Sequence, residues 1–394
     1  RHVVRARRRL HRGSDALADQ VVVDGPVEVE ALADRPRGGE EFVGGEVEQV
    51  SVGCSHGPTV RRGNMTVAME ATASDDHPSD DPRSDDHRSD DHPSDDHRSD
   101  DDTAARNQAA LDDLVRLLDL EASEVNLFRG NSPDENRQRV FGGQVAGQAL
   151  VAAARTIDEA GRLVHSLHAY FLRPGDPNVP ILYEVDRIRD GRSFSTRRVV
   201  AIQHGRAIFN LQTSFHDPEP GPDHQLEMPS DMGDPEALPD FKTRMAPYAD
   251  QLGDWYDRPR PIDLRYVDGD PMSRKGQPST TQHVWLRANG TLPDDPVLHA
   301  CIVTYASDMT LLDTTVLPFG LAWDSPGMQM ASVDHAMWFH RPFRADEWLL
   351  YDQAALSTSS ARGLAGGAIY TTDGRLVVSV VQEGLARIAP MART

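Results

Sequence analysis

A duplicated motif constrains the fold of this chain more than any other feature of its sequence. The segment HAYFLRP, which begins at His168, returns as HAMWFHRP from His335. A second pair follows in the same order, with HGRAIFNLQ from His204 and DGRLVVSVVQ from Asp373. The members of the two pairs lie 167 and 169 residues apart. Because order and spacing are both kept, the sequence predicts two copies of one unit, neither of which buries its apolar face alone.

The hydrophobic pattern within each copy indicates one helix and several strands. In the first copy we expect a helix rich in small residues at 142–157 and strands at 163–172, 181–188, 194–203 and 207–215. In the second copy we expect a helix from Asp295 to about Asp313 and strands at 330–339, 348–356, 364–370 and 375–382. One helix with antiparallel strands predicts an α+β fold in which a sheet wraps around a central helix. The glycines at 142, 143 and 147 lower helix propensity, which suggests that another backbone packs against them.

The pattern divides the chain into four parts. Residues 104–216 are the first unit, 217–282 a connector rich in Pro, Asp and Gly, and 283–394 the second unit. Residues 1–103 are an extension that ends in an acidic repeat of the SDDHP type, for which we expect disorder because it has no apolar residue to bury. Residues 1–64 are either upstream sequence before a start at Met65 or Met69, or an Arg-rich targeting arm. The repeat is a solvated tail or, alternatively, a weak binder of divalent metal.

Charge and cysteine content exclude several classes of protein. The formal net charge is −21, which argues against a nucleic-acid groove. Cys54 and Cys301 are the only cysteines, so there is no disulfide framework and no zinc site built on cysteine. No apolar run reaches the roughly 20 residues that cross a bilayer. We therefore expect a cytoplasmic protein that needs no metal or other cofactor and has no stable membrane association.

Three polar residues stand where the pattern calls for apolar ones. Asp308 falls in the apolar stripe of the second helix, Ser332 opens the strand that leads to His335, and Gln382 ends the apolar run LVVSVV. A buried carboxylate is costly, so Asp308 is either a hydrogen-bonded structural residue or a group held for chemistry. A strand-end Gln and a strand-start Ser also have ordinary structural explanations, and His335 is expected to be packed.

Other candidates and missing motifs narrow the chemistry. Arg362, Arg197 and Arg198 could meet an anionic tail of a bound molecule, but for each of them we expect a position on the surface. The sequence contains no GxSxG, no HExxH and no GxxxxGK[ST] motif. These absences argue against a covalent serine hydrolase, a zinc protease and a P-loop enzyme.

Several long motifs in order resemble one family. They span about residues 117–388 and include RVFGGQVAGQAL from Arg139, YASDMTLL from Tyr305, ASVDHAMWFHRPF from Ala331 and VVQEGLAR from Val380. The chain resembles the bacterial acyl-CoA thioesterase II family, whose fold is a double hotdog. The resemblance implies hydrolysis of fatty acyl-CoA to free acid and CoA, with acyl-CoA as the partner molecule and a homo-oligomer as the assembly.

The resemblance also implies roles for particular residues. In this family an Asp, a Ser or Thr and a Gln hold a water, and the matching positions here are Asp308, Ser332 and Gln382. Asp308 would be the general base, and backbone N–H groups around 142–144 (Gly142, Gly143 and Gln144) would stabilise the oxyanion. The first copy has His165 where the second has Ser332, so one working site per chain is expected. The alternatives are a non-catalytic acyl-CoA-binding protein and a hotdog enoyl-CoA hydratase.

Overall fold

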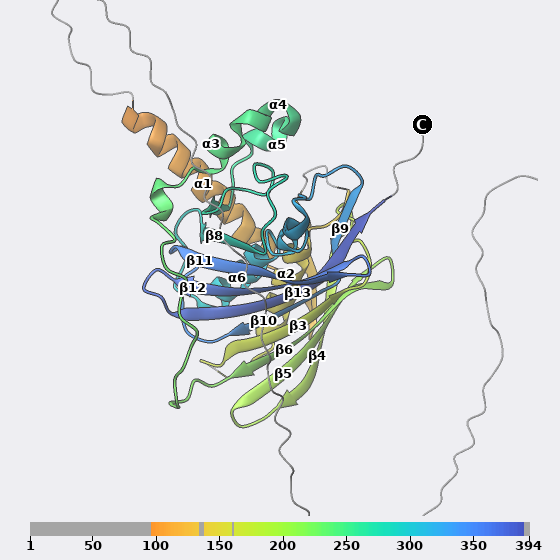
Figure 1. The fold of residues 1–394 in the computed structure, drawn as a ribbon. Coiled ribbons are helices and arrows are strands. Elements are labelled where there is room, and N and C mark those ends of the chain that lie inside the picture. The colour runs from red at the N-terminus through yellow and green to blue at the C-terminus, as the bar shows by residue number, and fades with distance from the viewer. Residues whose placement is uncertain (1–95, 134–137, 160, 390–394) are drawn as a thin grey trace, which may run out of the picture. The chain divides into compact units, whose positions relative to one another are not determined.

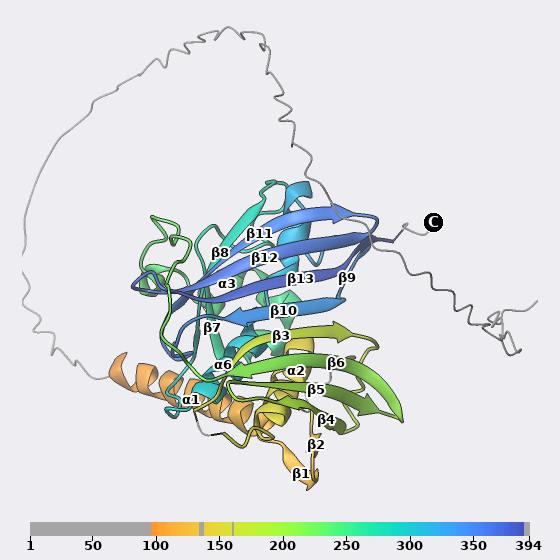
Figure 2. The same cartoon turned by 90° about the horizontal axis from the view of Figure 1, so that it is seen from below.

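The two copies of the motif lie side by side at the centre of one antiparallel sheet (Figure 2). The structure, a computed structural model, describes residues 96–133, 138–159 and 161–389, and of residues 96–101 only the course of the backbone. The predictions for residues 1–95, which include Cys54 and most of the acidic repeat, lie outside the described residues. No helix in the described part of the chain is long and apolar enough to span a membrane.

Thirteen strands of the described chain form this sheet, and the central helix of each copy packs against it (Figure 1). The elements in chain order are α1 (Asp96–Leu118), β1 (Glu121–Glu124), β2 (Leu127–Gly130), α2 (Gly142–Ala154), β3 (Leu163–Phe171), β4 (Ile181–Asp190), β5 (Phe194–Gln203), β6 (Arg206–His216), η1 (Pro235–Ala237), α3 (Phe241–Met245), η2 (Ala246–Tyr248), α4 (Ala249–Leu252), α5 (Asp254–Asp257), β7 (Ile262–Tyr266), β8 (Thr281–Ala288), α6 (Pro296–Ser307), η3 (Leu312–Phe319), β9 (Met328–Ser332), β10 (Asp334–Phe339), β11 (Leu349–Ser359), β12 (Arg362–Thr371) and β13 (Leu376–Ile388).

The strand order repeats itself across the middle of the sheet. One half runs β1-β2-β4-β5-β6-β3 and the other β10-β13-β12-β11-β8-β7, so each of these twelve strands has a counterpart at the same distance from the centre. The thirteenth strand, β9, pairs with β13 outside this order. At the junction His335 pairs with Ala169 and Ala336 pairs with His168. The two His-Ala dipeptides of the duplicated motif therefore pair with each other, as a local two-fold axis requires. The prediction of a duplicated unit is confirmed.

The paired helices α2 and α6 explain the small residues of α2. A Cβ on Gly143 would lie 2.4 Å from the backbone oxygen of Tyr305, and one on Gly147 would lie 3.4 Å from that of Cys301. The predicted close approach of another backbone is therefore confirmed, and that backbone belongs to α6. Leu150 of α2 and Val303 of α6 are buried in one hydrophobic core that spans both copies.

Three predicted boundaries are wrong. The second helix ends at Ser307 with Asp308 as its C-cap, rather than at Asp313, and a 3-10 segment follows from Leu312. The connector predicted to end at 282 already contains β7, which pairs with β8, because its alternating pattern is hidden between Pro- and Asp-rich flanks. Helix α1 begins at Asp96, before residue 104, where the first unit was predicted to start. Acidic residues are favourable in the first turns of a helix, so the end of the repeat can join it.

Candidate functional site

The three polar residues singled out in the sequence meet in the second copy. The hydroxyl of Ser332 donates to Asp308 Oδ1 at 3.0 Å, and Gln382 Nε2 donates to the same oxygen at 2.5 Å. Gln382 Nε2 also donates to Ser332 Oγ at 2.9 Å. The two amide hydrogens and the hydroxyl hydrogen are all used in this triangle, which fixes one carboxylate oxygen and leaves Oδ2 outside it.

A β-bulge places Ser332 in the triangle. The sequence predicted one strand at 330–339, but the chain forms β9 and β10 with Val333 between them. Ser332 pairs with Gly384 and Ala336 with Val381, so the register against β13 shifts by one residue. Such a bulge changes the face toward which a side chain points and is common beside active sites. The bulge is held by the Val333 N–H, which donates to Glu383 O at 2.9 Å.

Burial makes Asp308 an unusual carboxylate. Desolvation raises its pKa to about 6, although hydrogen bonds from Gln382, Ser332 and the Gly143 backbone N–H lower it. A carboxyl group with a pKa near 6 is mostly ionised at pH 7 and yet basic enough to take a proton from water. The side chain is half-buried, so one edge remains open to the adjoining space.

That space is a cavity of about 510 Å³ between the two copies. The second copy supplies Asp308 and Ser332, and the first supplies the start of α2 and the end of β3. Most of the wall is apolar, and its members include Phe171, Ile208, Phe209, Met309 and Leu312. An apolar cavity with a few converging polar groups is typical of a site for a small molecule.

The start of α2 adds backbone donors to the cavity. The N-cap residue is Phe141, whose side chain cannot accept a hydrogen bond. The first N–H groups of the helix are therefore not capped by an N-cap side chain. Gly142 lines the cavity, and a Cβ there would lie 2.6 Å from Asp308 Oδ2. The Gly143 N–H donates to Asp308 and is therefore already used. Because the first N–H groups of a helix have no intrahelical acceptor, the Gly142 N–H is the donor that this helix start offers to an anion or a polarised carbonyl.

The side chains of two other predicted contact residues point away from Asp308, although Gln144 was predicted to act through its backbone N–H. The side chain of Gln144 is buried, and its amide nitrogen donates to Asn131 O at 3.1 Å and to Ser132 Oγ at 3.2 Å. Arg362 is half exposed and pairs with Glu383 at 2.9 Å, and it is not among the residues that line the cavity. Neither side chain therefore meets Asp308 in this structure.

The remaining sequence candidates divide between surface and interior. Arg198 is exposed and pairs with Asp186 at 3.2 Å. Arg197 is fully buried, and the expectation of a surface position is wrong because Asp190 and Thr156 provide partners for its guanidinium. His335 is packed as predicted, with Nε2 2.8 Å from the Ser307 hydroxyl, and burial lowers its pKa to about 4.

Three residues at the cavity escaped the sequence reasoning. Asp313 lines the wall, and burial, with help from the nearby carboxylates of Asp308 and Asp324, raises its pKa to about 7. The exposed side chains of Arg139 and Arg173 also line this cavity. Both arginines belong to motifs noted in the sequence, RVFGG and FLRP. The motifs alone did not show that the two side chains line the same cavity as Asp308. The described residues contain no group of three or more His, Cys, Asp or Glu side chains that could hold a metal ion.

Comparison with known families gives a consistent result for both copies. The profile of the family described as "Acyl-CoA thioesterase" matches residues 263–385, and that of the "Acyl-CoA thioesterase N-terminal domain" matches residues 132–216. The chain is 41% identical to human acyl-coenzyme A thioesterase 8, covering 70% of this chain and 88% of that protein. It is 38% identical to acyl-CoA thioesterase 2 of Haemophilus influenzae, covering 71% and 98% respectively.

Solved structures agree with this result. The acyl-CoA thioesterase II TesB2 of Mycobacterium marinum matches with a TM-score of 0.59 and 44% identity, over 71% of this chain and all of that one. A protein of unknown function with a hot dog fold from Alicyclobacillus acidocaldarius matches with a TM-score of 0.58 and 18% identity, over 71% of this chain and 99% of that one. The second likeness concerns the fold alone.

Proposed function

Because this chain belongs to the acyl-CoA thioesterase family and has its double hotdog fold, we propose that it hydrolyses fatty acyl-CoA through a water activated by Asp308. The observation that carries this proposal is the half-buried carboxylate. Three donors hold it at the wall of an apolar cavity, and Oδ2 lies outside the triangle. A carboxylate fixed in this way can orient a water and accept its proton in one position.

The proposed reaction needs no covalent intermediate. A water donates one hydrogen to Asp308 Oδ2, and its oxygen attacks the thioester carbon as the proton passes to the carboxylate. The carbonyl oxygen becomes an oxyanion that accepts hydrogen bonds from the uncapped start of α2, with Gly142 N–H as the proposed donor. Collapse of the tetrahedral intermediate breaks the C–S bond. Asp308 returns its proton to the leaving thiolate, so the products are the free acid and CoA.

Ser332 and Gln382 position the base and thereby the water. Both donate to Asp308 Oδ1, so the carboxylate cannot rotate without breaking two hydrogen bonds. A hydrogen bond to a charged group contributes about 1.5–3 kcal/mol, which is enough to hold one rotamer. The same two bonds stabilise the ionised carboxylate, which keeps it available as a base at neutral pH.

The substrate has a natural orientation in the cavity. The acyl chain would lie along the apolar wall formed by Phe171, Phe209 and Leu312. The exposed guanidinium groups of Arg139 and Arg173 would meet phosphates of CoA outside the apolar wall. The second copy provides the base, and the first provides the oxyanion donors, so one working site per chain needs both copies. A homo-oligomeric assembly and a cytoplasmic location stay predictions from the sequence.

Substitution of Asp308 by Asn tests the proposal. Asn keeps the shape and an acceptor oxygen but is not a base, so we expect thiol release from acyl-CoA to fall at least 100-fold while the fold is kept. The matched control is Asp334→Asn. Asp334 is also a half-buried carboxylate, and it accepts the Glu383 N–H at 2.8 Å without lining the cavity.

The control should keep most of the parental rate. If Asp308→Asn also hydrolyses acyl-CoA at the parental rate, the assigned base is wrong. The same thiol assay separates the alternatives, because a non-catalytic binder and a hydratase would both leave the thioester intact in the parental protein.

A further inference from the structure

A second cavity lies where the duplication places the counterpart of the first. Its volume is about 530 Å³, against about 510 Å³ for the cavity beside Asp308. The first cavity is lined by Phe171 and Pro174 of HAYFLRP, and the second by Phe339 and Pro342 of HAMWFHRP. The start of α2 lines one cavity and the start of α6 the other. The fold therefore forms the same kind of space twice.

The hydrolytic groups are missing from the second cavity. His165, three residues before His168, takes the place of Ser332, which lies three residues before His335. In the sheet register Arg197 faces Thr213 where the second copy has Ala365 facing Gln382. The amide of Gln382 is thus replaced by a threonine whose hydroxyl donates to Ser166 O at 2.9 Å.

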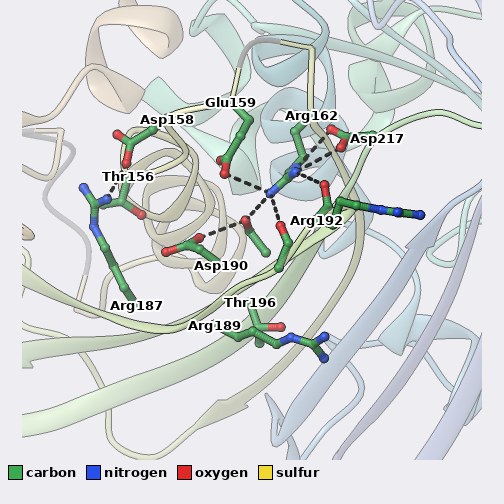
Figure 3. A network of polar contacts seen from close by, with 12 residues as sticks. Thr156, Asp158, Glu159, Arg162, Arg187, Arg189, Asp190, Arg192, Thr196 and Asp217 are labelled. Carbon is green, nitrogen blue, oxygen red and sulfur yellow. Dashed lines mark hydrogen bonds and ion pairs between the residues drawn. The ribbon is translucent and has the colours of Figure 1, made fainter.

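Two further differences at the helix ends leave the second cavity without the groups proposed for hydrolysis. The α2 helix is followed by Arg155 as its C-cap, where α6 has Asp308, so no carboxylate stands at this point of the first copy. Here the buried guanidinium of Arg197 donates to Thr156 and Asp190. Arg162 pairs with Asp217 and Glu159 in the same part of the first copy (Figure 3). At the start of α6, the Asp295 side chain accepts the Val297 and Leu298 N–H groups, whereas the start of α2 has no such cap.

One residue in the wall of the second cavity has a buried donor without a partner. His299 of α6 lines it and is only 2% exposed. Its Nδ1 accepts the Ala345 N–H at 3.1 Å, so the ring proton is on Nε2. Burial lowers the pKa of His299, which keeps the ring neutral. Nε2 is buried and finds no acceptor among the described residues, and an unpaired buried donor costs about 1–3 kcal/mol.

The walls are suited to an alkyl chain. Apolar lining residues come from β3, α6, the end of β10 and the segment after it, and they include Leu163, Val164, Ala300, Phe339 and Phe343. The three arginines of the lining are already paired with carboxylates, Arg341 with Asp223, Arg344 with Asp346 and Arg375 with Asp373. A ligand that fits has an apolar body and one carbonyl oxygen, and it does not require a large negative charge.

We propose that the second cavity binds a fatty acyl group and does not hydrolyse it, with the acyl carbonyl oxygen accepting the His299 Nε2–H. This inference rests on the proposed function, since it assumes that the equivalent first cavity takes the acyl chain. The acyl group could arrive as the free acid that the reaction releases or as a second acyl-CoA. Both present the same chain and the same carbonyl oxygen to the cavity.

Binding stoichiometry on the full-length parental protein tests the inference. The probes are a fatty acid and a 2-oxoalkyl-CoA of the same chain length, which keeps the carbonyl but has no thioester to cleave. We expect two bound acyl groups per chain for at least one probe. Two with the acid alone identify a product site, and two with both probes identify a site that also accepts acyl-CoA.

A matched pair of variants assigns each event to its cavity. Leu163 and Met330 are half-buried, line the second and first cavity respectively, and stand 167 residues apart like the duplicated motifs. Leu163→Trp should abolish binding in the second cavity and keep binding in the first, and Met330→Trp should do the reverse. Circular dichroism shows that each variant is folded. His299→Phe should weaken only the event that Leu163→Trp removes, by about five- to tenfold, the value of one hydrogen bond.

If the parental protein binds only one acyl group per chain and Leu163→Trp does not affect that binding, the inference is overturned. This outcome in a protein that still hydrolyses acyl-CoA leaves the proposed function intact. Failure of the proposed function has a different signature, because the parental protein would then release no thiol at all.

Discussion

Ser332 shows how one hydroxyl connects geometry with pH dependence. It donates to Asp308 and accepts from Gln382, so its removal breaks two sides of the triangle. The carboxylate must be ionised to act as a base, and burial places its pKa at about 6. Activity should therefore rise with pH through an acid limb near pH 6 and reach a plateau above it.

Ser332→Ala should shift the acid limb of the activity profile to higher pH. Loss of a donor to the ionised form raises the pKa of Asp308 further, by about one unit if the bond contributes about 1.5 kcal/mol. The rate on the plateau should also fall, by about 10-fold or more, because the base loses one of its two side-chain donors. A pH profile of kcat/KM checks both effects, and Ser332→Thr, which keeps the hydroxyl, is the control. A limb that stays near pH 6 in the alanine variant would contradict the role given to this bond.

Residue identity could be predicted from sequence where a polar side chain interrupts an apolar pattern. Asp308, Ser332 and Gln382 were found for that reason, and the family resemblance pointed to the same positions. Asp313 was missed because the helix was expected to continue to it, whereas α6 ends six residues earlier. Arg197 was expected on the surface because its buried partners, Asp190 and Thr156, come from other elements. Pattern alone does not show such long-range pairing.

At the scale of elements, the contact between α2 and α6 sets the position of the site. Gly143 touches the α6 backbone at Tyr305, and its own N–H donates to Asp308. The glycine content of α2 made a close neighbour predictable, but the bulge at Val333 was not, because no residue type marks it. The end of α6 was also misplaced, since its apolar spacing continues into the 3-10 segment at Leu312.

Gly143→Ala should destabilise the protein although alanine favours helices. The new Cβ would lie 2.4 Å from the Tyr305 carbonyl oxygen, and overpacking costs about 1–3 kcal/mol against a propensity gain of about 1 kcal/mol. Gly147→Ala in the same helix is the control, because the atoms nearest to its new Cβ are a Leu118 methyl at 3.1 Å and the Cys301 oxygen at 3.4 Å, both farther away than the Tyr305 oxygen is from Gly143. Urea unfolding should show the larger loss for Gly143→Ala. Equal losses would mean that the helix contact is not the tight one described.

At the scale of the whole molecule, the two copies share one sheet and one core. The β3–β10 pairing joins the halves, and the core cluster includes residues from both. The duplication and the antiparallel order were predictable from the repeated motif. The mutual pairing of His168 and His335 segments was not, because a repeat in sequence does not say which strands meet. Figure 1 shows the result as one continuous sheet rather than two separate ones.

A cut between Pro220 and Gly221 should leave the enzyme assembled. This segment is exposed and lies outside the strands, so a protease site inserted there can be cleaved in the folded protein. We expect the two fragments to stay together and to keep most of the activity, measured by gel filtration and thiol release, with the uncut insertion protein as control. Fragments made separately should be insoluble, because each would expose β3 or β10 as a long open edge. Separation of the cut halves without denaturant would contradict a shared core.

The central claim is that Asp308 directs a water onto the thioester instead of attacking it. Single-turnover hydrolysis in H2¹⁸O, with protein in excess over acyl-CoA, tests this claim most directly. Mass spectrometry then reads the fatty acid and the peptide that contains Asp308. We predict one ¹⁸O in the acid released in the first turnover and none in Asp308. Unlabelled acid together with ¹⁸O in the Asp308 carboxyl group would contradict the claim, because it would show that the carboxylate itself was the nucleophile.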